Sequence, residues 1–131
     1  MLPQEHDEMM TVALGLSHFI AIVSADTLLS LDRLQQMEAI GGSTYKMLLT
    51  LVKGVISQEA EFYASLQMNL PNMVEIEELF QERAKIWADL VKNKDRQESA
   101  QRMNHLRNRF KKSDPNLEKG YENMYRIIER L

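Results

Sequence analysis

Apolar residues recur along the chain at the three- and four-residue spacing of an α-helix, and no stretch alternates long enough to predict a strand. The first segment, residues 4–29, is apolar around most of its circumference, which predicts a helix inside a bundle or a dimer. Its apolar run from Val12 to Ala25 is shorter than the roughly 18 residues of a membrane span. We therefore expect a buried central helix and no membrane contact.

Caps, glycines and prolines divide the rest of the chain into further helices. These are a short helix over 31–40 that ends at Gly41-Gly42, a long helix over 43–69 with Ser43 as N-cap, a third over 73–92, a fourth from its cap Asp95 to about Lys112, and a last one that begins at Pro115. Gly54 lies inside the long helix 43–69, so we expect either close packing or a bend there.

The predicted fold class is all-α, with five to six helices whose long apolar members form a bundle and a dimer core. The chain has 131 residues, which suits one helical domain over 1–131, and its five glycines and three prolines are too few for a β-sandwich. It contains no cysteine, which excludes disulfides, thiolate metal sites and a thiol nucleophile. Residues 1–70 have a net charge of −5 and residues 71–131 of +2, so nucleic acid is not an expected partner.

Several chemistries are absent from the sequence. No Gly-x-Gly-x-x-Gly or phosphate-binding loop occurs, so we expect no bound nucleotide. The histidines stand in neither a His-Glu-x-x-His nor a Glu-x-x-His pattern, so we expect no metal site. No catalytic residue is therefore predicted in this chain. The N-terminus lacks the basic region of a signal peptide, and we expect a cytoplasmic protein.

Two histidines interrupt the apolar first helix. His6 and His18 point roughly 120° apart and lie about 18 Å apart along the helix axis, so they cannot bind one metal ion within one chain. Asp7 shares a face with His18, whereas Ser17 points away and forms no catalytic pair with it. His18 is either a core histidine with a hydrogen-bond partner or a residue that lines a ligand pocket.

Lys46 and Lys53 lie seven residues apart on one face of the helix 43–69. Either their amines reach solvent at the edge of the helix, or they bind a carboxylate ligand. Tyr63 points about 80° from Lys53 and could border the same cavity.

Two segments, "EHDEMMTVALGLSHF" and "STYKMLLTLVKGVISQEAEFYASLQMN", resemble the C-terminal domain of prephenate dehydrogenases. The shared features are a His-Asp pair, a second histidine twelve residues later followed by Phe, and a long helix with Gln-x-Ala-Glu-x-Tyr-Ala; they cover about residues 5–70. The resemblance implies a 6-phosphogluconate dehydrogenase C-terminal-like fold and a homodimer. It also implies a parent enzyme that converts prephenate to 4-hydroxyphenylpyruvate with NAD or NADP in tyrosine biosynthesis, with the nucleotide on an N-terminal Rossmann domain that this chain lacks.

The same resemblance assigns roles to individual residues. His18 and Tyr63 correspond to substrate-pocket positions, and His6 and Asp7 to a structural pair near the domain junction. The family's substrate-binding arginine falls on Gly54, which leaves Lys53 as the nearest cation for the substrate. Lysine cannot form the bidentate contact that arginine makes with a carboxylate.

The main hypothesis is therefore a domain that forms the dimer and closes the substrate pocket of a prephenate dehydrogenase. One alternative is a non-catalytic dimerisation module that kept the fold and lost the ligand, which the glycine at position 54 favours. A second is the helical domain of a related dehydrogenase that acts on another carboxylate.

Overall fold

The computed structural model describes residues 1–131 and contains helices joined by short segments, with no strand. This confirms the all-α class. When α1, η1 and α2 are counted as one continuous helix, seven helices are present. This is one more than the upper end of the predicted range, because the segment 43–69 forms two helices. The chain divides into two compact units, residues 1–78 and 79–131, which are described separately. That residues 1–131 act as one domain stays a prediction.

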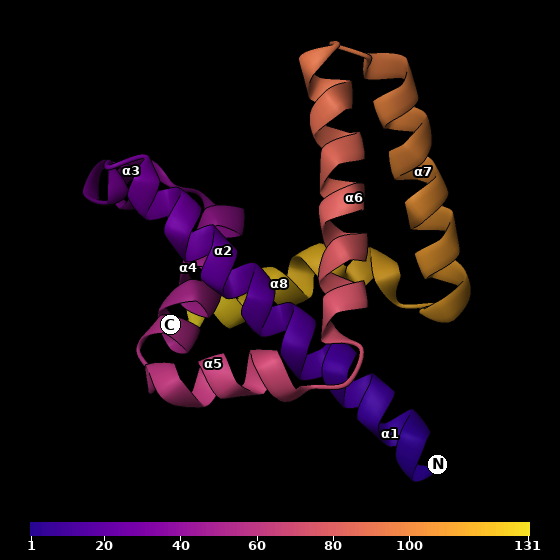
Figure 1. Ribbon diagram of the computed structural model, residues 1–131. Helices are drawn as coiled ribbons and strands as arrows, with labels where there is room; N and C mark the ends of the chain where they lie inside the picture. Colours follow the sequence, from indigo (N-terminus) through magenta and orange to yellow (C-terminus); the bar gives the residue numbers. More distant parts are fainter. The chain divides into compact units, whose positions relative to one another are not determined.

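One continuous helix of 28 residues opens the chain, as the apolar pattern predicts (Figure 1). It consists of α1 (Pro3–Met10), the π-helical segment η1 (Thr11–Leu16) and α2 (Ser17–Ser30). Only 17% of its most apolar 18-residue stretch is buried within the chain. Of the two predicted settings, a bundle within one chain is thus not found, because too few neighbouring side chains cover the helix. Burial in a dimer stays a prediction.

The helix is also long and apolar enough to cross a membrane, by length and composition alone. The length argument drawn from Val12 to Ala25 was wrong, because the helix extends well beyond that run at both ends. The core helix of a soluble protein and a signal sequence pass the same test. The absence of membrane contact stays a prediction.

Two helices, not one, occupy the segment 43–69. After α3 (Leu34–Ile40), the chain forms α4 (Ser43–Ile56) and then α5 (Ala60–Asn69), with a break between them. A Cβ at Gly54 would meet nothing within 4 Å, so close packing does not explain this glycine. The helix ends two residues later. Ser43 was predicted as the N-cap of this helix. It is instead the first helical residue, and the N-cap is Gly42.

The core of residues 1–78 lies mainly where α4 packs against α2. Ala21 and Ala25 are buried on α2, and their small side chains let α4 approach closely. The buried apolar residues are Ala21, Ala25, Leu49, Val52, Val55 and Met73. This core is small for 78 residues, and many larger apolar side chains remain exposed.

The second unit begins inside α6 (Met73–Lys92) and continues with α7 (Arg96–Ser113), the 3₁₀ turn η2 (Leu117–Lys119) and α8 (Gly120–Glu129). Asp95 caps α7 as predicted, since its carboxylate accepts a hydrogen bond of 3.1 Å from the backbone N–H of Glu98. Pro115 does not open the last helix, which begins at Gly120. No residue from 79 to 131 is buried, so these helices are largely solvated.

Candidate functional site

The π-helical segment η1 is anchored to the turn that follows α5. Thr11 is only 1% exposed, and its hydroxyl lies 2.6 Å from the backbone oxygen of Pro71 and 3.0 Å from that of Asp7. Because these contacts hold the first helix against a segment sixty residues away, Thr11 sets where the rest of that helix lies. π-Helical turns within α-helices are frequent at functional sites.

Gly15 is the second point of contact in η1. It is buried, and a Cβ there would lie 2.4 Å from the sulfur of Met73 and 3.1 Å from Leu70 Cδ1. Its backbone oxygen accepts a hydrogen bond of 2.9 Å from Nε2 of Gln67 on α5. The absence of a side chain therefore lets α5 and the start of α6 approach η1 closely.

His18 follows one turn after Gly15 and faces the same helix. Its ring meets that of Tyr63 edge to face, with 4.7 Å between centroids and 89° between the planes. Both side chains are partly buried. Phe62 extends the cluster, with its ring 5.3 Å from that of Tyr63. The structure thus brings together two of the three predicted substrate-binding residues.

The Nδ1 atom of His18 is buried and has no hydrogen-bond partner. A core histidine would be expected to have one, because an unpaired buried polar atom is destabilising. The structure therefore does not show the hydrogen bond that His18 would make as an ordinary core residue.

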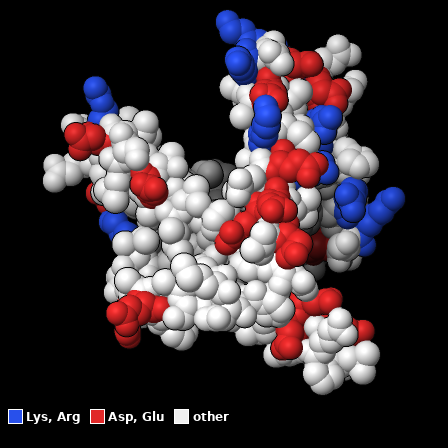
Figure 2. All heavy atoms as spheres, viewed as in Figure 1, with Lys and Arg blue, Asp and Glu red and all other residues white.

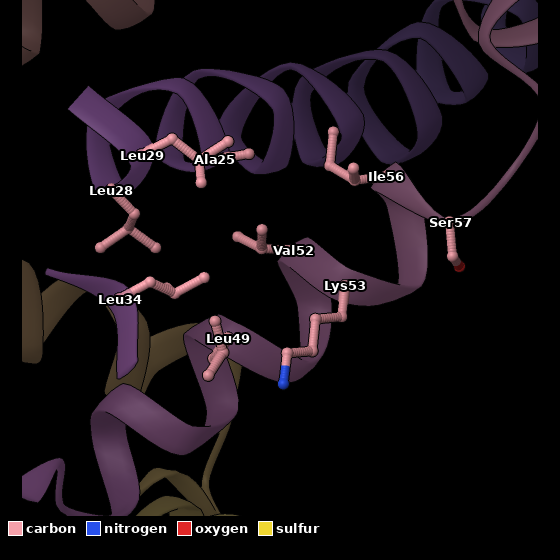
Figure 3. A pocket seen from close by; sticks show the side chains of 9 residues that line it. All are labelled: Ala25, Leu28, Leu29, Leu34, Leu49, Val52, Lys53, Ile56 and Ser57. Atoms are coloured by element: carbon pink, nitrogen blue, oxygen red, sulfur yellow. The ribbon is translucent and has the colours of Figure 1, made fainter. Parts of the chain in front are cut away.

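Lys53 lies in a different part of the unit. Its amine forms a 2.7 Å ion pair with Glu38 of α3, and its side chain is 61% exposed. It borders a pocket of about 450 Å³ between α2, α3 and α4, where Leu28, Leu34, Leu49 and Val52 converge (Figure 3). Neither His18 nor Tyr63 lines this pocket. Within one chain, the structure does not join Lys53 to the His18–Tyr63 cluster.

The remaining predicted residues lie at the surface. His6 and Asp7 are exposed on α1, with 3.8 Å between His6 Nδ1 and Asp7 Oδ1. Lys46 and Gly54 are exposed on α4. Their predicted roles remain predictions. No cluster of three or more His, Cys, Asp or Glu side chains could hold a metal ion.

Large apolar side chains are exposed on several elements of residues 1–78. They include Val12, Val23 and Leu29 of the first helix, Leu51 and Ile56 of α4, and Phe62 and Met68 of α5. Figure 2 shows a broad uncharged surface over α2 and α5, whereas acidic and basic side chains gather over α6 and α7. Exposed apolar area on this scale is typical of a protein–protein interface.

An all-α domain with a small core and an uncovered apolar helix belongs to the class of helical association domains. The chain is a member of the prephenate dehydrogenase dimerization domain family, whose model matches residues 2–112. It is similar to the probable arogenate/prephenate dehydrogenase of Methanocaldococcus jannaschii, with 32% identity over 96 residues. That alignment covers 72% of this chain and 22% of the relative, so the chain spans about a fifth of the relative's length. No solved structure matches the chain.

Sequence reasoning missed three residues that shape this region. Thr11 and Gly15 had a detectable signal in the sequence. A hydroxyl and a glycine interrupt an otherwise apolar helix, which is typical of a position where another segment packs closely against the helix. Gln67 had a weaker one: it lies four residues after Tyr63, and so on the same helix face. Its partner Gly15 is distant in sequence, which no local pattern reveals.

Proposed function

We propose that this chain forms the homodimer of a prephenate dehydrogenase and supplies part of its substrate pocket. The observation that supports it best is the 28-residue apolar helix, of whose most apolar stretch only 17% is buried by its own chain. Removal of apolar surface from water is the dominant favourable term in most protein–protein association. A second copy would supply the missing cover, as the family's description as a dimerization domain suggests.

The proposed reaction of the parent enzyme is the oxidative decarboxylation of prephenate to 4-hydroxyphenylpyruvate, a step of tyrosine biosynthesis in the cytoplasm. His18 and Tyr63 would border the substrate, where an aromatic ring edge and an imidazole can pack against a six-membered ring. Lys53 would provide positive charge near a carboxylate, in the dimer or with the parent's other domain in place.

NAD or NADP would bind outside this chain. The residues present do not fit a dinucleotide: the chain has no strand, and therefore no strand–glycine-loop–helix unit to hold a pyrophosphate. The expected partner for this purpose is the N-terminal Rossmann domain of the parent protein. The contribution of this domain to the reaction is thus binding and orientation.

The test is kinetic and uses the natural protein to which this chain belongs. Replacing His18 with alanine should lower kcat/KM for prephenate at least tenfold, because the substrate loses a contact in its pocket. Replacing His105, which is exposed on α7, is the matched control and should change little. Unchanged catalytic efficiency in the His18→Ala variant would remove His18 from the site.

The alternative of a non-catalytic dimerisation module keeps one specific observation in its favour. By the resemblance, the family's substrate-binding arginine falls on Gly54, and in the structure Lys53 is paired with Glu38. Calorimetry with prephenate on the natural protein distinguishes the two: saturable binding heat supports the enzyme, and no heat with an intact dimer supports the module.

A further inference from the structure

Two buried polar atoms without partners lie in neighbouring parts of the contact between the first helix and α5. One is Nδ1 of His18, and the other is Oε1 of Gln67. The third such atom in the chain, the hydroxyl of Tyr45, is on α4. Buried polar groups in folded proteins are nearly always hydrogen-bonded, so two orphans in one contact call for a common explanation.

The orientation of the Gln67 amide is fixed by its other end. Nε2 donates to the backbone oxygen of Gly15 at 2.9 Å. A flipped amide would place Oε1 against that carbonyl, and two acceptors repel each other. Oε1 is therefore the atom left over, and it can only accept a hydrogen bond.

Two observations place His18 on the same helix-to-helix contact as this acceptor. It is three residues after Gly15, and residues three apart lie on the same helix face. Its ring contacts Tyr63, which is four residues before Gln67 on α5. The two contacts between the helices, Gly15 with Gln67 and His18 with Tyr63, thus follow one another along the same pair of faces.

We propose that Gln67 is a positioning residue for His18: its Oε1 accepts a hydrogen bond from His18 Nδ1–H. An imidazole nitrogen that carries a proton is a donor, so this pair satisfies both orphans at once. The bond forms when the two side chains turn toward each other. It holds His18 in the tautomer with the proton on Nδ1, and the lone pair of Nε2 is left to accept a hydrogen bond from a ligand hydroxyl.

Only the ligand hydroxyl in this inference rests on the proposed function. The tautomer of His18 does not depend on that function. A hydrogen bond through Nδ1 fixes the orientation of the ring. Histidines that bind metal ions are fixed in the same way, by a hydrogen bond from the ring nitrogen that does not bind the metal. Loss of the acceptor would leave the ring free to adopt the Nε2–H tautomer, which isolated imidazole side chains favour in water.

The experiment is ¹⁵N NMR of the histidine ring nitrogens in the ligand-free protein, above the pH at which imidazole is protonated. In the wild type, Nδ1 of His18 should resonate as a protonated nitrogen and Nε2 as an unprotonated one. Gln67→Met removes the acceptor with little change in size, and the two resonances should reverse or average. Gln67→Glu also removes the bond to Gly15 but keeps an acceptor, so it should retain the wild-type pattern.

The pair of variants separates positioning from structural support. If Gln67 only braced Gly15, Met and Glu would have the same effect, because both lose the Nε2 donor. The proposal is overturned by an Nε2–H tautomer in the wild type, or by a Met variant with the wild-type pattern. Circular dichroism checks that the variants fold, and if Met does not, the wild-type and Glu spectra still decide. Because no ligand is added, a negative NMR result would not contradict the proposed function. In the same way, an absence of prephenate activity would not contradict the hydrogen bond between Gln67 and His18.

Discussion

Single side chains determine how closely the first helix meets the end of α5. Thr11, the one fully buried polar residue, binds the Pro71 carbonyl, and Gly15 leaves room for Met73. These two residues and Gln67 place His18 against Tyr63. The geometry of the contact between His18 and Tyr63 thus depends on small or polar residues in a segment whose other positions are mostly apolar.

Thr11→Val should destabilise the fold by about 1–2 kcal/mol, because the Pro71 carbonyl loses its donor in a partly buried contact while the side-chain volume stays the same. Chemical denaturation followed by circular dichroism measures the free energy of unfolding. Thr27→Val is the matched control: its hydroxyl bonds only Val23 within its own exposed helix, and the change should be close to zero. Equal effects of both substitutions would show that the Pro71 contact contributes nothing.

Gly54→Arg should be accommodated and should stabilise the protein by about 0.5–1 kcal/mol. The site is helical and open, so arginine meets no obstacle, and it loses less backbone entropy than glycine. Thermal unfolding measures the gain. If position 54 corresponds to the family arginine, the same variant should also bind prephenate more tightly than wild type. A lower unfolding temperature would mean that position 54 is covered, as at a subunit interface.

At the scale of elements, the sequence predicted most boundaries because the signals are local. The first helix was expected over 4–29 and occupies Pro3–Ser30, and α6 and the Asp95 cap agree with their predictions. The break between α4 and α5 was missed, because Ser57, Gln58 and Glu59 include neither glycine nor proline.

The candidate site could be predicted only in part. His18 and Tyr63 lie 45 residues apart in the sequence, and their rings are in contact. The family resemblance named both residues as pocket positions, whereas helical periodicity says nothing about contacts between distant segments.

The end of α7 is joined to η2 by an exposed ion pair. Lys111 donates a 3.1 Å hydrogen bond to Glu118, and this bond, with the charges of Lys111 and Arg107, lowers the pKa of Glu118. A lowered pKa in the folded state means that the pair contributes stability above the unfolded pKa and loses it as pH falls through the folded pKa. The contribution is small, since both side chains are solvated.

NMR titration of the Glu118 side-chain carbon should therefore give a midpoint below that of an ordinary glutamate. Lys111→Met should raise that midpoint toward the usual value, whereas Lys112→Met, which alters a neighbouring lysine, should leave most of the shift in place. An ordinary midpoint in the wild type would show that the ion pair does not persist in solution.

At the scale of the whole molecule, most large apolar side chains of the chain are not buried by the chain itself. Eight of its 131 residues are buried, all of them within residues 1–78. A stable domain of this size normally buries much more of its apolar surface. The dimer proposal accounts for this difference, because obligate homodimers have interfaces that resemble a domain core cut in half.

Sedimentation equilibrium of the purified chain at micromolar concentration tests that claim most directly. The account predicts a single species with twice the 15.2 kDa mass of one chain, and no dissociation on dilution to the detection limit. A folded, stable species of 15.2 kDa would contradict it, because the apolar helix would then face water with nothing to cover it.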